Sequence, residues 1–176
     1  MSLGSLRTRL LLAGVLTIAL AVSASAFGLL ALFERHVTRR IDTELGVHLT
    51  QLVAGLDRAN ERDGTITLVR RPAEPRFEQP LSGLYWQIVV EPGHQLLRSR
   101  SLWDGELPLP ADRLGDGAVH HHAITGPGGT QLHVLERLAE LPARLGFARA
   151  RVAVAIDAAE IERASSDFAR DLTLPL

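Results

Sequence analysis

Leu10–Phe33 reads LLLAGVLTIALAVSASAFGLLALF, a run of 24 residues without one charged side chain. As a helix this segment would be about 36 Å long, enough to cross a hydrocarbon core of about 30 Å with some tilt. Arg7 and Arg9 precede it and Glu34 follows it, a distribution that favours an N-inside orientation. The sequence therefore predicts a cytoplasmic N-terminus at 1–9, a transmembrane helix at 10–33, and the rest of the chain outside the cytoplasmic membrane.

A cleaved secretory signal peptide is the alternative interpretation of the same segment. Val22–Ala26 has the small residues of a cleavage site, and the residues from 10 to 22 would be its apolar core. The apolar run nevertheless continues to Phe33 and passes without a proline into another helical pattern, which favours an uncleaved anchor. Both interpretations export the rest of the chain.

Composition limits what the exported part can be. About 140 residues remain after the anchor, which suits one domain with a core of its own. This part holds all 20 acidic residues and 17 of the 19 arginines, and no basic patch indicates nucleic-acid binding. Cysteine is absent, so no disulfide framework is available. Lysine is absent as well, which excludes a P-loop.

Hydrophobic periodicity predicts a long helix, several short strands and a closing helix. The first helix should continue out of the membrane to about Ala59, because apolar residues recur on one stripe: Ile41, Leu45, Leu49, Leu52 and Leu56. Short strands are expected at 65–69, 84–90, 95–99, 118–125, 130–138 and 147–156, and the closing helix at 158–170. The fold predicted for 34–171 is therefore α+β, with an antiparallel sheet of five to six strands flanked by helices.

The end of the chain turns apolar again. After Asp171 it reads LTLPL, and residues 172–176 are expected to begin a second transmembrane helix. An ordinary frayed C-terminus is the alternative.

Three strings inside the predicted sheet region are similar to a known family. Ser82–Ile88 (SGLYWQI), Leu97–Asp104 (LRSRSLWD) and Leu107–Pro110 (LPLP) resemble the sensor domains of bacterial two-component sensor histidine kinases of the PhoQ-like type. The resemblance covers essentially the whole chain. It implies a PAS/PDC-like fold, in which an antiparallel sheet lies between a long N-terminal helix and other helices, and a location in the bacterial inner membrane facing the periplasm.

The same resemblance implies that the kinase machinery lies outside this chain. No segment has a phospho-accepting histidine followed by acidic and Arg-Thr-Pro residues, and no glycine-rich ATP lid occurs. The chain would bind a stimulus and transmit it, with no cofactor of its own. ATP, Mg²⁺ and the response regulator would belong to the missing kinase core. Magnesium sensing is not expected, because the acidic residues are scattered and no three are consecutive.

The histidines are the sharpest local signal. His120, His121 and His122 fall in one predicted strand, and a four-residue loop at 126–129 would place His122 opposite His133. Alternation then puts His120, His122 and His133 on one face of the sheet. Three imidazoles could form a Zn²⁺ or Ni²⁺ site, or a pH sensor that uses the charging of imidazole near pH 6 to 7. A solvated histidine-rich strand without a role is the alternative.

A second candidate site involves arginine. Arg98 and Arg100 should alternate on one strand face next to Tyr85 and Trp86, where they could clamp a carboxylate or phosphate ligand in bidentate fashion. Pairing of these arginines with scattered surface acids, and packing of the tryptophan in the core, are the alternatives.

The leucine stripe suggests how a signal could be transmitted. Ile41, Leu45, Leu49, Leu52 and Leu56 could pack helix against helix in a parallel homodimer, with ligand binding biasing two dimer packings. Packing on the domain's own sheet is the other use of the stripe, and the two are not exclusive. The resulting expectation is a stimulus-sensing region of a membrane histidine kinase. The rivals are a membrane-anchored periplasmic binding or assembly protein and a tethered enzyme, for which no catalytic constellation occurs.

Overall fold

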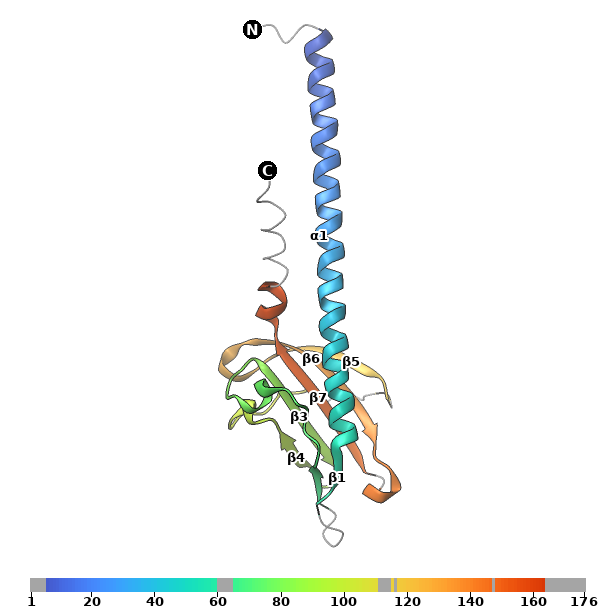
Figure 1. The fold of residues 1–176 in the computed structure, drawn as a ribbon, viewed down its shortest axis with the longest axis vertical. Helices are drawn as coiled ribbons and strands as arrows, with labels where there is room; N and C mark the ends of the chain where they lie inside the picture. The colour runs from blue at the N-terminus through green and yellow to red at the C-terminus, as the bar shows by residue number, and fades with distance from the viewer. Residues whose placement is uncertain (1–5, 60–64, 111–114, 116, 147, 164–176) are drawn as a thin grey trace. The chain divides into compact units, whose positions relative to one another are not determined.

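The computed structural model describes residues 6–59, 65–110, 115, 117–146 and 148–163. The chain divides into two compact units, residues 1–39 with 164–176 and residues 40–163. Within the described residues its labelled helix and strands (Figure 1) are α1 (Leu6–Gly55), β1 (Leu56–Arg58), β2 (Ile66–Leu68), β3 (Leu84–Glu91), β4 (Gln95–Arg98), β5 (Val119–Thr125), β6 (Gln131–Glu140) and β7 (Arg149–Asp157). Short 3-10 helices are η1 (Pro75–Glu78), η2 (Arg100–Leu102), η3 (Pro127–Gly129) and η4 (Ala143–Leu145).

The first unit contains the N-terminal part of α1. A window of this helix is long and apolar enough to cross a membrane, by length and composition only, and none of that window is buried inside the protein. Helical structure over 10–33 agrees with the sequence prediction.

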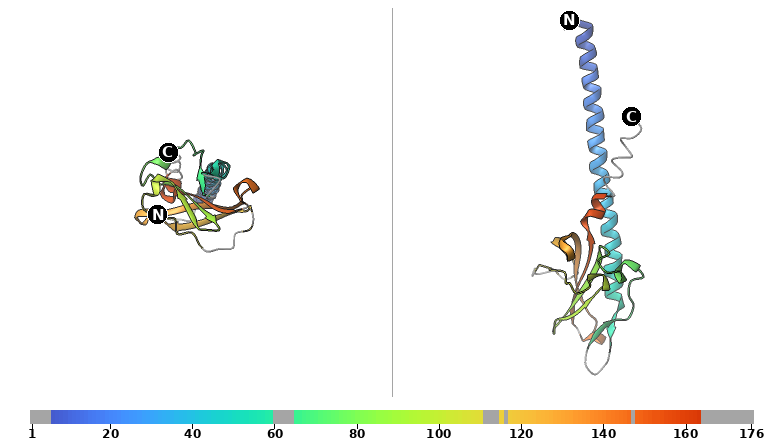
Figure 2. Two further views of the ribbon diagram at one scale, coloured as in Figure 1. Left: turned by 90° about the horizontal axis from the view of Figure 1, so that it is seen from below. Right: turned by 90° about the vertical axis from the view of Figure 1, so that its left-hand side faces the viewer.

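The second unit is built on an antiparallel sheet in the strand order β4-β3-β7-β6-β5. The chain forms the hairpins β3–β4, β5–β6 and β6–β7, and β7 then returns beside β3 at the centre. A separate two-stranded sheet joins β1 to β2. Figure 2 shows the part of α1 that belongs to this unit lying on one side of the larger sheet. The α+β architecture is therefore confirmed, with five strands in the main sheet.

The helix-facing side of the sheet holds the larger core. Leu45, Leu49 and Leu52 are at most 1 % exposed, because they pack against side chains from the central strands, among them Trp86 and Val154. The predicted leucine stripe thus packs on the domain's own sheet. The helix ends at Gly55 rather than near Ala59, and Leu56 joins the same core from β1.

The opposite side of the sheet is covered by residues 99–110, which follow β4 and which we call the crossing segment. β4 and β5 are consecutive strands at opposite edges, so the chain between them must cross four strand spacings of about 4.8 Å. Leu102 and Leu107 of this segment bury Tyr85 and Val134. The side-chain amide of Gln87 also holds the backbone of Leu107. The Leu107 N–H donates to Gln87 Oε1 at 2.8 Å, and the Leu107 carbonyl accepts from Gln87 Nε2 at 3.3 Å. Helices on both faces were expected, but this side has no α-helix among the described residues.

Four more of the expected strands are present close to their predicted positions. The strands expected at 65–69, 84–90, 95–99 and 147–156 correspond to β2, β3, β4 and β7, and β7 is buried on both faces as expected. β1 was not predicted. Residues 158–163 of the expected closing helix are helical, whereas its remainder and 172–176 lie outside the described residues.

Candidate functional site

The register of the β5–β6 hairpin decides where the histidines point. Ala123 lies opposite His133, and His122 lies opposite Val134. The predicted pairing of His122 with His133 is therefore wrong by one residue. The cause is the turn: η3 and its left-handed Gly128 extend the loop to Thr130, so that Thr125 pairs with Gln131. A slip of one residue moves a side chain to the other face of the sheet, and His133 does not share a face with His120 and His122.

The helix-facing side carries what we call the Asp42 cluster, made of Asp42, His121 and His133. The Asp42 Oδ1 atom lies 2.8 Å from His133 Nε2, a hydrogen bond that joins α1 to β6, and 3.8 Å from His121 Nδ1 on β5. The side chains of Asp42 and His133 are 26 % and 21 % exposed, and that of His121 is 50 % exposed. The helix thus brings Asp42 to two histidines of the β5–β6 hairpin, at a site open to solvent.

The other side of the sheet carries what we call the Glu136 network, made of Glu136, Arg151, His120 and His122. Glu136 is fully buried, and its Oε1 accepts a hydrogen bond from Arg151 Nε at 2.8 Å. The same guanidinium donates to the Pro110 carbonyl at 2.8 Å, which fastens the crossing segment to β7. The arginine charge compensates the buried carboxylate, so we assign this network a structural role.

The two histidines of the Glu136 network are incompletely bonded. His122 Nε2 lies 3.0 Å from Glu136 Oε2, but the two groups are not oriented as a hydrogen bond, and both atoms are buried. His120 Nε2 is also buried without a hydrogen-bond partner in the described part of the chain. The rings of His120 and His122 are near parallel, with centroids 6.4 Å apart.

Only the Asp42 cluster has the geometry of a metal site within the described ranges. Its three potential ligand atoms lie within 4.8 Å of one another. The expected trio of His120, His122 and His133 is replaced by a set in which only His133 remains. Neither Asp42 nor Glu136 was identified from the sequence.

The predicted arginine clamp is not assembled. β4 ends at Arg98 and Arg100 begins η2, so the two do not alternate along one strand. Tyr85 and Trp86 are buried and belong to the cores on opposite sides of the sheet. Arg98 instead donates to the Gly105 carbonyl at 2.7 Å, which holds the start of the crossing segment.

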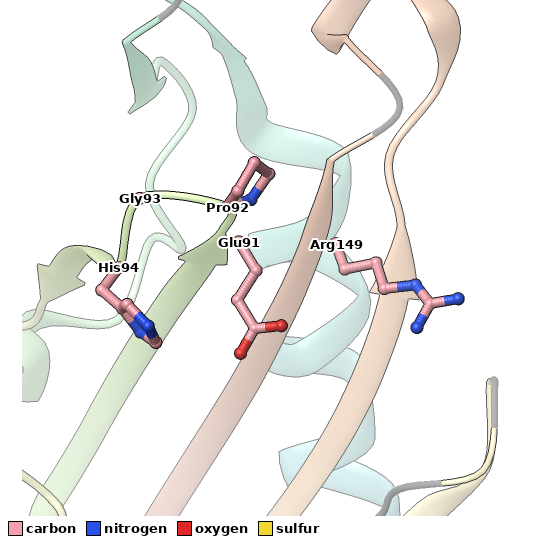
Figure 3. A pocket seen from close by; sticks show the side chains of 5 residues that line it. All are labelled: Glu91, Pro92, Gly93, His94 and Arg149. Atoms are coloured by element: carbon pink, nitrogen blue, oxygen red, sulfur yellow. The ribbon is translucent and has the colours of Figure 1, made fainter.

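A hollow of about 500 Å³ lies at the end of the sheet, lined by Glu91, Pro92, Gly93, His94 and Arg149. Figure 3 shows the Arg149 guanidinium extending away from the Glu91 carboxylate. The charged groups of this hollow do not converge on a common point, so we assign no site to it.

In comparison with known proteins, no family model, no curated protein and no solved structure matches this chain.

Proposed function

We propose that this chain is the extracytoplasmic sensing region of a bacterial two-component sensor histidine kinase, anchored in the inner membrane with the sheet domain in the periplasm. One observation carries the proposal. A single helix, α1, contains both the apolar segment at 10–33 and the leucines that pack on the sheet. A stimulus that binds the sheet domain would therefore act directly on the helix that crosses the membrane.

The packing of α1 explains how a small change could be transmitted. Leu45, Leu49 and Leu52 are enclosed by the sheet core, so a movement of the sheet must be accommodated by the helix. Packed helices respond to such changes by shifts of about 1–2 Å between discrete arrangements. The proposal includes a PAS/PDC-like identity for the domain, which is supported by a long helix against one face of an antiparallel sheet.

The proposal also places the catalytic parts elsewhere. ATP, Mg²⁺ and the phospho-accepting histidine belong to a cytoplasmic kinase core, and a response regulator is its partner. The chain acts as a homodimer, since such kinases transmit through paired helices. The buried leucine stripe is unavailable for that contact, and the exposed side of α1 takes its place, with Thr43, Val47, Thr50 and Ala54 at heptad spacing.

A membrane-anchored periplasmic binding or assembly protein is the second candidate. The apolar segment of α1 and the solvent-accessible Asp42 cluster support it equally well. The two candidates differ in the sequence that each requires beyond residue 176. A sensor kinase requires a second span and a kinase core in the same reading frame, whereas a binding protein does not.

The first test is therefore the coding sequence downstream of codon 176. A second apolar segment followed by a histidine kinase core is expected, and a stop codon at that point would exclude the kinase. The full-length protein in membrane vesicles should then autophosphorylate. Deletion of 40–163 should leave phosphorylation intact and abolish its response to any stimulus.

Orientation can be tested separately, because the chain has no natural cysteine. Val119 is 43 % exposed in the sheet domain, and Leu6 is 75 % exposed near the N-terminus. A membrane-impermeant maleimide should label Val119→Cys in intact spheroplasts and Leu6→Cys only after lysis. The reverse pattern would contradict the proposed orientation.

A further inference from the structure

We infer that Asp42, His121 and His133 form a binding site for a divalent transition-metal ion, with Zn²⁺ as the ion that suits them best. Two ligands at about 2.0–2.1 Å from a tetrahedral zinc lie about 3.3 Å apart. The two distances from Asp42 Oδ1, 2.8 Å to His133 Nε2 and 3.8 Å to His121 Nδ1, lie on either side of this value. Shifts of about half an ångström would bring both of these pairs to the zinc spacing, and all three potential ligand atoms already lie within 4.8 Å of one another.

The three potential ligands are held in place by strand pairing and core packing that do not depend on a metal ion. His121 and His133 are diagonal neighbours on paired strands, where the register is fixed by a continuous ladder from Val119 to Thr125. Asp42 lies beside Ile41 and one turn before Leu45, both of which pack on the sheet core. The domain core thus presents the carboxylate to the two imidazoles before any ion arrives.

The donor set selects the class of ion. Two imidazole nitrogens with one carboxylate oxygen suit Zn²⁺ and its transition-metal neighbours. Mg²⁺ and Ca²⁺ prefer sites made of oxygen alone, so they fit poorly. Three protein ligands leave a fourth position for water or an incoming ligand, and the half-exposed His121 gives access from solvent.

A histidine–aspartate hydrogen bond accounts for only part of this arrangement. It explains the contact between Asp42 and His133. It does not explain His121, whose Nδ1 is too far from Asp42 for a hydrogen bond and yet lies among the same three potential ligand atoms. A bound cation would bring all three together.

The bound ion would join α1 to the β5–β6 hairpin at the point where the helix begins to pack on the sheet. That the ion is a stimulus rests on the proposed function, whereas the binding itself does not. If the protein binds Zn²⁺ here and the reading frame encodes no kinase, the metal site stands and the sensor proposal fails.

The test is calorimetric titration of Zn²⁺ into the untagged, chelator-treated full chain in detergent. One ion per chain is expected. His121→Ala should weaken binding by at least about tenfold, as should Asp42→Asn, which keeps the size of the side chain. His121 is the key position because it is half exposed and makes no hydrogen bond to Asp42, so the fold is expected to tolerate its removal. Co²⁺ bound to the parent should show the visible absorption of a four-coordinate site, and His121→Ala should lose it.

Two matched controls separate this site from the other histidines. His94→Asn removes an exposed imidazole at the end of the sheet, and His122→Ala removes one on the opposite face. Both variants should bind Zn²⁺ as the parent does. No binding by the parent, unchanged binding by His121→Ala, or loss of binding only in a control variant would overturn the assignment.

Discussion

Two glycines of α1 have opposite surroundings, and substitution of each by alanine should have opposite effects. A Cβ on Gly46 would meet nothing within 4 Å, so Gly46→Ala should stabilise the fold by about 0.5–1 kcal/mol through helix propensity. A Cβ on Gly55 would lie 2.1 Å from the Arg70 carbonyl oxygen, where β2 leads back over the helix end. Gly55→Ala should therefore destabilise by about 2 kcal/mol or more, because backbone must move. Thermal unfolding followed by circular dichroism measures both, and equal effects of the two substitutions would contradict this packing.

Two glutamates of β6 lie beside arginines of β7, and the two glutamates differ in how deeply they are buried. Glu136 is fully buried beside Arg151, whereas the side chain of Glu140 is 66 % exposed and lies 3.7 Å from Arg149. Glu136→Gln removes the counter-charge of the Arg151 guanidinium, whose side chain is only 20 % exposed, so it should cost about 3 kcal/mol. Glu140→Gln should change the free energy of unfolding by less than about 0.5 kcal/mol. Denaturant titration of the two variants tests this, and a cost below about 1 kcal/mol for Glu136→Gln would mean that water reaches the network.

At the scale of single residues, the sequence identified which side chains could form a site better than it predicted how they are placed in the sheet. The histidine cluster was recognised, but its register depended on whether the Gly126–Gly129 turn absorbs one more residue, and the alternation signal of β5 is too weak to decide that. Glu136 had a readable signal, since it alternates with Leu132 and Val134 on a buried face. Asp42 had none, because 91 positions separate it from His133 and only the folded helix brings them together.

The exposed stripe of α1 gives an element-scale prediction about the proposed homodimer. Single cysteines at Thr43, Val47, Thr50 and Ala54 should form disulfide crosslinks in membranes, because these positions are exposed at heptad spacing. Cysteines at Leu45, Leu49 and Leu52 should not, because those side chains are at most 1 % exposed within one protomer.

The buried set is the matched control for this experiment, since it lies on the same helix over the same span. Crosslinks at the leucine positions would mean that the helix leaves its own sheet to dimerise. An absence of crosslinks at all seven positions would remove the dimer contact from this part of α1.

Elements with strong periodicity were predictable, and those set by topology were not. β3 and β7 are long and apolar, and both were placed within one or two residues. β1 was missed because Leu56–Arg58 continues the helical pattern, and the helix stops there only because β2 closes over Gly55. The cover of the second sheet face was also unpredictable, because it follows from the opposite-edge positions of β4 and β5.

At the scale of the whole molecule, the division of the chain predicts that residues 40–163 fold without the apolar segment. This fragment keeps both cores, including the α1 leucines that cover the helix-facing side of the sheet. It should be soluble without detergent and unfold in one cooperative transition, at a midpoint within a few degrees of the full chain. A fragment of 56–163 is the matched control: without α1 it exposes Trp86, Ile88 and Val154, so it should aggregate or lack a cooperative transition. If the longer fragment also fails to fold, the sheet domain depends on the apolar segment, and the two units cannot be treated as independent.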